Sequence, residues 1–188
     1  MNMKNAALFS LMLGLFVALS TLPSCSKSSN NSNTTQPTLY DSLGGTTMVA
    51  DPANSGQTIE QGRLGIRSVV DSAIFVIAGD DSISPYFMTL LAEVTANNFS
   101  GFNALSKNLT DFFCVGTGAK DFTYTGLSMA NAHNPATNPR ISDKVSVNAF
   151  NEFIVDVGKG AVKNGLPGNL IASLVVVIDS QMSLVVQR

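Results

Sequence analysis

Four long segments of the chain carry apolar residues at helical spacing, and this pattern limits the possible folds more than any other feature. In each segment, apolar residues recur every three or four positions and form one broad face, as expected of a helix that packs on a core. Glycine and proline residues lie between the segments. The sequence therefore predicts an all-α domain of five or six helices. The long segments span residues 63–78, 99–115, 146–164 and 167–182.

The composition agrees with one compact domain. About 45% of the 188 residues are apolar and only 13% are charged, so a buried core is easily built. The formal net charge is −2 and the sequence has no cluster of lysine and arginine. Because nucleic-acid binding needs a basic surface, we expect no nucleic-acid partner.

The N-terminal segment is typical of an exported protein. Lys4 precedes an apolar run over residues 6–19, which suits a signal peptide better than a membrane span. Residues 22–25, with the sequence LPSC, resemble a bacterial lipobox. We predict that residues 1–24 are a lipoprotein signal peptide and that Cys25 is lipidated, which would anchor the protein to a membrane. The alternative is an ordinary secretory signal with a chance cysteine.

Residues 25–38 are rich in serine, asparagine and threonine, and this composition predicts a flexible tether. The folded domain would then span residues 39–188. The tether lacks an acidic run, so we expect a lipid-anchored protein of the bacterial cell envelope that faces the periplasm. Cys114 is the other cysteine, and with Cys25 acylated it is expected to be a buried free thiol.

Residues 46–62 interrupt the helical pattern. They are polar and contain Asp51-Pro52 and Ser55-Gly56, which favour turns, so we expect an insertion that forms an ordered excursion or a long loop. Such loops are often functional, but an inert insertion is an equal alternative. In the last helical segment, residues 174–178 are apolar almost all round, which predicts deep burial.

His133 is the sole histidine of the chain. The following segment, residues 134–139, contains two prolines and cannot continue a helix, so His133 is expected at a helix end. A single histidine is more often structural than functional, because one imidazole makes no catalytic constellation by itself. Its surroundings therefore decide between the two interpretations.

Several short motifs, taken in order, resemble those of truncated haemoglobins, group 1 in particular. The resemblance covers about residues 39–187, apart from the insertion and extra residues after His133. It implies a truncated-globin-like helical sandwich, two helices over two, with haem b as cofactor. The matching motifs are LYDSLGG at 39–45, residues 66–87, LTDFF at 109–113, YTG at 124–126 with Met129 and His133, and GLP at 165–167.

The resemblance implies a role for several residues. His133 would be the proximal ligand of the haem iron, with its second ring nitrogen donating to a backbone carbonyl. Phe87 would pack against the porphyrin, while Phe112, Phe113 and Met129 would line the pocket. A propionate would meet the distal helix at Asn108, where Lys107 could substitute as the cation.

On the distal side the chain departs from the family pattern. Ile74, Leu105 and Leu109 stand where the family usually has a tyrosine, a glutamine or a neighbouring polar residue, and none of the three can donate a hydrogen bond. A donor to a dioxygen ligand would contribute about 1–3 kcal/mol. We therefore expect fast oxygen dissociation and weak discrimination among diatomic gases. Peroxidase chemistry is disfavoured, since no distal acid or base is present.

These inferences predict a membrane-tethered haem-binding protein that reversibly binds a diatomic gas, oxygen or NO, rather than an enzyme. The alternative is a haem-free globin-fold lipoprotein that acts as a structural or protein-interaction module, because apolar distal residues also suit a pocket that fills itself. A third hypothesis, an enzyme that uses Cys114 or the Asp80-Asp81 carboxylates, lacks a base beside the thiol.

Overall fold

The computed structural model describes residues 36–188 of the chain. The predicted signal peptide, Cys25 and most of the predicted tether lie outside the described residues. The domain begins where the sequence indicates, at helix α1 (Leu39–Ser42). Thr38 caps this helix by accepting a hydrogen bond from the Asp41 amide, and the Asp41 carboxylate accepts from the Thr38 amide in return.

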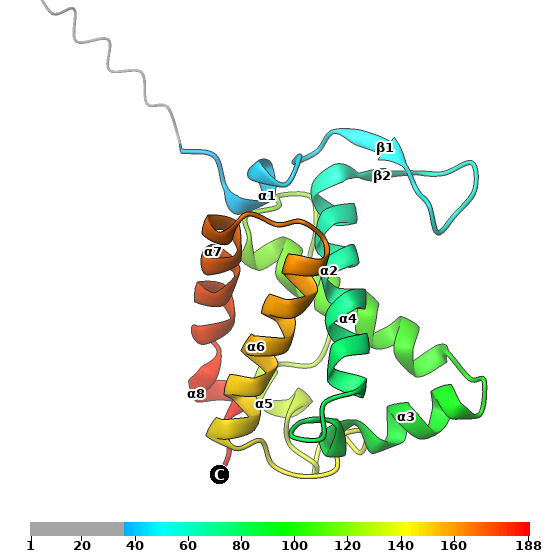
Figure 1. Cartoon of the computed structure of the whole chain (residues 1–188), viewed down its shortest axis with the longest axis vertical. Helices are drawn as coiled ribbons and strands as arrows, with labels where there is room; N and C mark the ends of the chain where they lie inside the picture. Colours follow the sequence, from blue (N-terminus) through cyan, green and yellow to red (C-terminus); the bar gives the residue numbers. More distant parts are fainter. Residues whose placement is uncertain (1–35) are drawn as a thin grey trace, which may run out of the picture. The chain divides into compact units, whose positions relative to one another are not determined.

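Helix α2 (Gln61–Ala78) lies at the centre of the domain. It packs against α4 (Ser100–Gly116) and α6 (Val147–Lys163), and α6 packs in turn against α7 (Gly168–Asp179), as Figure 1 shows. The apolar face that the sequence predicts for α2 is the one that is buried. The pair α2 and α4 and the pair α6 and α7 form the predicted sandwich around one core. The buried side chains of α2 are Ile66, Val69, Val70, Ala73, Ile74 and Ile77.

Gly160 allows α6 to approach the backbone of α2. A Cβ atom at this position would lie 2.8 Å from the backbone nitrogen of Ala73 and 2.9 Å from the carbonyl oxygen of Val69. Both neighbours are backbone atoms of a helix, which cannot rotate away as a side chain would. The absence of a side chain at Gly160 therefore sets how closely the two central helices approach.

The insertion at residues 46–62 is an ordered β-hairpin rather than a loop. Strands β1 (Met48–Ala50) and β2 (Thr58–Glu60) pair in antiparallel fashion, and β2 leads directly into α2. The carboxylate of Asp51, in the turn, accepts a hydrogen bond of 2.7 Å from Arg67 of α2. Of the two alternatives, the ordered excursion is therefore the one present, and its strands were not predicted because strands of three residues are too short to show an alternating pattern.

The structure has more helices than the five or six predicted. Eight α-helices and one 3-10 helix lie within residues 36–188. The shorter elements are η1 (Ser84–Phe87), α3 (Met88–Thr95), α5 (Met129–Ala132) and α8 (Met182–Val185). Helix α5 is the one that the sequence predicts to end at His133. Elements of four residues such as η1 and α8 were not predicted separately, because they have too few positions to show a 3.6-residue period.

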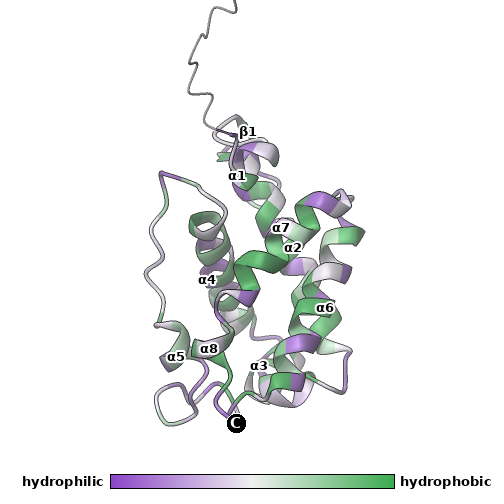
Figure 2. Ribbon diagram, turned by 90° about the vertical axis from the view of Figure 1, so that its left-hand side faces the viewer, coloured by the Kyte–Doolittle hydropathy of each residue, from purple (hydrophilic) through white to green (hydrophobic). Residues whose placement is uncertain are grey.

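The last predicted helix is divided, and its apolar run is only partly buried. Helix α7 ends at Asp179, and α8 follows after Ser180 and Gln181. Figure 2 shows that α7 is hydrophobic along much of its length, yet Val176 is 68% exposed. Leu174 and Ile178 are buried, but the expectation that residues 174–178 are all deeply buried was wrong. Helix α7 packs against α6 and α1 and leaves its outer face uncovered.

Among the described residues, no helix is both long enough and apolar enough to cross a membrane.

Two glycines of α6 test the close approach to α2. A Cβ at Gly158 would meet no atom within 4 Å, whereas one at Gly160 would overlap the α2 backbone. We expect Gly160→Ala to lower the free energy of unfolding by about 1–3 kcal/mol, because the helices must separate. Gly158→Ala should raise it by about 0.5–1 kcal/mol, because alanine favours a helix more than glycine does. Urea unfolding measures both, and equal effects would contradict this account.

Candidate functional site

The domain contains a partly open cavity of about 200 Å³ whose walls are almost wholly apolar. Its lining comes from α2, the segment from Ile83 to Val94, and helices α4 to α8 with their connections. Apart from Tyr86, the side chains in this lining that carry a polar group are those of His133 and Gln181. An apolar cavity with one imidazole in its wall is suited to a largely apolar ligand that one nitrogen atom can hold.

His133 lies at the C-cap of the short helix α5, where the proline-containing loop ends the helix as the sequence predicts. The loop satisfies the end of this helix with its own side chains. Asn138 donates a hydrogen bond of 2.7 Å to the carbonyl of Ala132, and Thr137 donates one of 2.8 Å to the carbonyl of Asn131. Because the carbonyls at a helix end need such donors, the loop after His133 stabilises α5.

The geometry of His133 fixes which of its ring nitrogens carries the proton. Nδ1 lies 2.8 Å from the carbonyl oxygen of Met129, one turn earlier in α5. A carbonyl oxygen only accepts, so Nδ1 is the donor. Burial lowers the pKa of His133 below its ordinary value of 6.5, although the hydrogen bond to Met129 opposes this effect. The ring is therefore neutral at pH 7, and Nε2 keeps its lone pair.

Comparison with solved structures identifies the architecture. The domain is similar to the crystal structure of a mutant truncated hemoglobin from Tetrahymena pyriformis in its Fe(III) form, with 16% sequence identity and a TM-score of 0.57. The similarity covers 80% of this chain and 99% of that one. The fold is that of a truncated globin. No protein-family model and no curated protein sequence matches the chain.

The truncated-globin fold brings together eight of the ten residues predicted for a haem pocket. They come from α2, η1, α4 and α5, and all of them line the cavity. The three residues on the predicted distal side are apolar, so none offers a hydrogen bond to a gas molecule. The eight residues are Ile74, Phe87, Leu105, Leu109, Phe112, Phe113, Met129 and His133.

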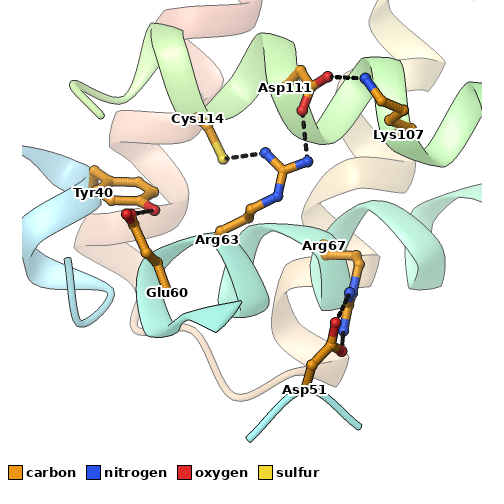
Figure 3. Close-up of polar contacts among 8 residues, drawn as sticks. All are labelled: Tyr40, Asp51, Glu60, Arg63, Arg67, Lys107, Asp111 and Cys114. Carbon is orange, nitrogen blue, oxygen red and sulfur yellow. Dashed lines mark hydrogen bonds and ion pairs between the residues drawn. The ribbon is translucent and has the colours of Figure 1, made fainter. Parts of the chain in front are cut away.

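Lys107 and Asn108 are not among the residues that line the cavity. Lys107 lies on a different face of α4 from Leu105 and Leu109, because two residues turn a helix by about 200°. Its ammonium group pairs with the Asp111 carboxylate at 2.7 Å, as Figure 3 shows. Asn108 is exposed to solvent. In this structure neither residue is placed to meet a ligand that fills the cavity.

Asp111 belongs to a polar cluster that joins α4 to α2, as Figure 3 shows, and its charged residues are not among those that line the cavity. Its other carboxylate oxygen accepts a hydrogen bond of 2.6 Å from Arg63, whose guanidinium lies 4.5 Å from the centroid of the Phe122 ring. Arg63 also lies 3.9 Å from the Cys114 sulfur. Each charged group has a partner, so we interpret the cluster as a structural connection between the helices.

Cys114 is fully buried beside Arg63, which confirms the expectation of a buried thiol. Burial raises the pKa of Cys114 to about 11, although the nearby guanidinium opposes the shift. Because the thiolate is the nucleophile, a thiol with this pKa is unreactive near pH 7. Within the described residues, no group of three or more histidine, cysteine or carboxylate side chains could hold a bare metal ion.

Several aromatic residues at the cavity were not predicted as site residues. The Phe75 and Phe102 rings lie 5.5 Å apart, and Phe75 is 66% exposed at the outer edge of the lining. Phe102 belongs to the predicted apolar face of its helix, so that pattern could have suggested it. The sequence did not indicate that Phe75 lines a cavity, because this residue lies outside the apolar stripe of α2.

The buried imidazole predicts how stability depends on pH. Since the folded-state pKa of His133 is lowered, the unfolded chain binds the proton more tightly. The free energy of unfolding should therefore fall as the pH drops below about 6.5, the pKa of an unperturbed histidine. Urea unfolding between pH 7.5 and 5.5 measures this slope. His133→Asn should reduce it, and an identical slope in the variant would contradict burial of the ring.

Proposed function

We propose that the cavity binds haem b, that His133 is the axial ligand of the iron, and that the protein reversibly binds a diatomic gas such as oxygen or NO. The observation that carries this proposal is the state of His133. Its Nδ1 is engaged by the Met129 carbonyl at 2.8 Å, so Nε2 is the basic nitrogen in the wall of an apolar cavity. Neutral imidazole with its second nitrogen hydrogen-bonded is the form of histidine that binds haem iron.

The rest of the lining fits a porphyrin. The ring of a porphyrin is flat and apolar, and phenylalanine side chains of η1 and α4, among them Phe87 and Phe112, provide apolar contact area. When bound, the haem would supply the iron at which a gas binds. The residues of the chain orient the imidazole through the Met129 carbonyl and exclude water with the apolar wall.

Ile74, Leu105 and Leu109 would determine how the bound gas is held. None of these side chains can donate a hydrogen bond, so polar dioxygen gains no advantage over a less polar gas such as CO. This supports a gas-binding or gas-exchange role over peroxide chemistry, which needs an acid or base near the ligand.

We further propose that the protein is tethered to a membrane of the bacterial cell envelope and faces the periplasm. The support is the sequence: an apolar run of signal-peptide length, the lipobox-like LPSC at residues 22–25 and the polar tether that follows. Metabolic labelling with a radioactive fatty acid, compared between the full chain and Cys25→Ser, tests this. Label in both proteins would contradict lipidation at Cys25.

Haem uptake tests the proposed function directly. Titration of the purified protein with haemin should give a sharp Soret band that saturates at one haem per chain. His133→Gly should lose the ligated spectrum, and added imidazole should restore it, because the free base can occupy the vacated position. Gln181→Ala is the matched control, since it removes another uncharged polar group from the cavity wall but leaves the proposed iron ligand in place.

A folded protein that takes up no haem would contradict the proposal and would favour the haem-free interaction module. A ligated spectrum that survives His133→Gly without imidazole would contradict the assignment of the ligand.

The apolar distal wall predicts a fast oxygen dissociation rate. Leu109→Gln introduces a donor at nearly constant volume, and a hydrogen bond worth about 1–3 kcal/mol should slow dissociation about 5-fold to 150-fold. Leu109→Met, which is similar in size but offers no donor, should leave the rate almost unchanged. Stopped-flow displacement of oxygen by CO measures all three proteins. A slow rate in the natural protein that Leu109→Gln does not change would contradict the apolar assignment.

A further inference from the structure

An ion pair at the edge of the cavity joins α3 to the loop between α5 and α6. Both guanidinium Nη atoms of Arg140 lie 2.8 Å from Glu93 Oε1, and Nη2 also lies 2.8 Å from Oε2. Their chain neighbours Val94 and Ile141 line the cavity, and so does Phe102. Glu93 and Arg140 are not themselves lining residues, but each directly precedes one, so the pair lies next to the apolar wall.

The pair rests on Gly101, in the first turn of α4. A Cβ at Gly101 would overlap the Glu93 carboxylate and would lie 2.5 Å from Arg140 Nη2. Gly101 is itself buried, and the N-cap residue Phe99 makes no side-chain cap, although the Asn98 side chain accepts a hydrogen bond of 3.1 Å from the Ser100 amide at this end of the 17-residue helix. Here, a glycine leaves space for a carboxylate, a guanidinium faces that space, and a helix N-terminus adds a favourable field for negative charge. In this structure the Glu93 carboxylate occupies the space.

We propose that Arg140 and Gly101 form a carboxylate-binding site of the cavity, and that an acidic group of the cavity ligand takes the place of the Glu93 side chain. The proposal rests on the proposed function, in which the ligand is a porphyrin with two propionates. It assigns the anionic edge of that ligand to the loop after His133 instead of to Lys107, which pairs with Asp111, and Asn108, which is exposed to solvent.

The energetics favour an exchange of carboxylates. The side chain of Arg140 is 44% exposed and that of Glu93 is 24% exposed, so their ion pair is partly solvated and contributes little to stability. A ligand carboxylate would make the same charge-assisted hydrogen bonds with the same guanidinium. The net cost is then mainly the release of Glu93 into water, where a carboxylate is well solvated. The apolar body of the ligand supplies the remaining binding energy.

A purely structural ion pair would behave differently in mutants. If the pair only tied α3 to the loop, loss of either partner would loosen the cavity in the same way for any ligand. If Arg140 binds the ligand and Glu93 competes with it, the two mutations have opposite effects. That difference should also disappear for a ligand without carboxylates.

The experiment compares haemin with haemin dimethyl ester, in which both propionates are blocked, on the full chain. Arg140→Gln should weaken haemin binding about fivefold to tenfold, as expected for loss of a partly exposed charge-assisted bond, and leave the ester unchanged. Glu93→Gln should tighten haemin binding and leave the ester unchanged. Gly101→Ala should weaken haemin binding as Arg140→Gln does, because its methyl group fills the space for the ligand carboxylate while both charged side chains remain.

Two controls isolate the site. Arg188→Gln removes another guanidinium near the cavity, one that pairs with Asp143 and lies over Tyr86, and should change neither affinity. Circular dichroism and thermal unfolding test whether each variant folds. If Arg140→Gln does not fold, Arg140→Lys, which keeps the positive charge, takes its place.

The outcomes separate this inference from the proposed function. Equal effects of Arg140→Gln and Glu93→Gln, or equal effects on haemin and its ester, would overturn the carboxylate site while haem binding stands. Failure of the natural protein to bind either porphyrin would overturn the proposed function, and the site with it.

Discussion

The close contact between α2 and α6 is the constraint on which the rest of the domain depends. Helix α2 packs on α6 on one side and on α4 on the other, so its position fixes both walls of the cavity. Gly160 makes this possible by leaving only backbone between the two helices. A small residue at this crossing therefore sets the spacing between α2 and α6, both of which carry residues that line the cavity. The ion pairs around Arg63 and Arg67 add connections around this arrangement, but each is individually of modest value.

Within this framework, the cavity and its surroundings combine two chemically different features. The Met129 carbonyl fixes the tautomer of His133 and leaves a basic nitrogen in an apolar wall. Burial keeps that ring neutral and therefore able to act as a ligand. Next to the wall, Glu93 and Arg140 form an ion pair beside Gly101 of α4. An apolar interior with one nitrogen ligand and charges close by suits an amphipathic ligand better than a purely apolar one.

The sequence predicted much of this arrangement for identifiable physical reasons. Long helices such as α2 show their period over several turns, so their extent and buried face could be predicted closely. The motifs around Phe87, Leu109 and His133 placed the cavity wall through their resemblance to truncated haemoglobins, and the prolines after His133 predicted its position at a helix end. Elements of three or four residues, such as the hairpin and α8, were missed since they are too short for any period. Lys107 was assigned to the pocket because the sequence alone does not show that its ammonium group pairs with Asp111. Arg140 was not predicted as a site residue, because its position depends on a contact with Glu93, which is distant in sequence.

The central claim is that the imidazole of His133 binds haem iron, and the presence of a single histidine makes this claim unusually direct to test. Resonance Raman spectroscopy of the ferrous haem-loaded protein measures the stretching band between iron and its axial nitrogen. If the account is correct, the band is present and shifts when the protein is grown with ¹⁵N-histidine, which labels this one residue. A haem-loaded protein whose spectrum shows no shift on labelling would contradict the account.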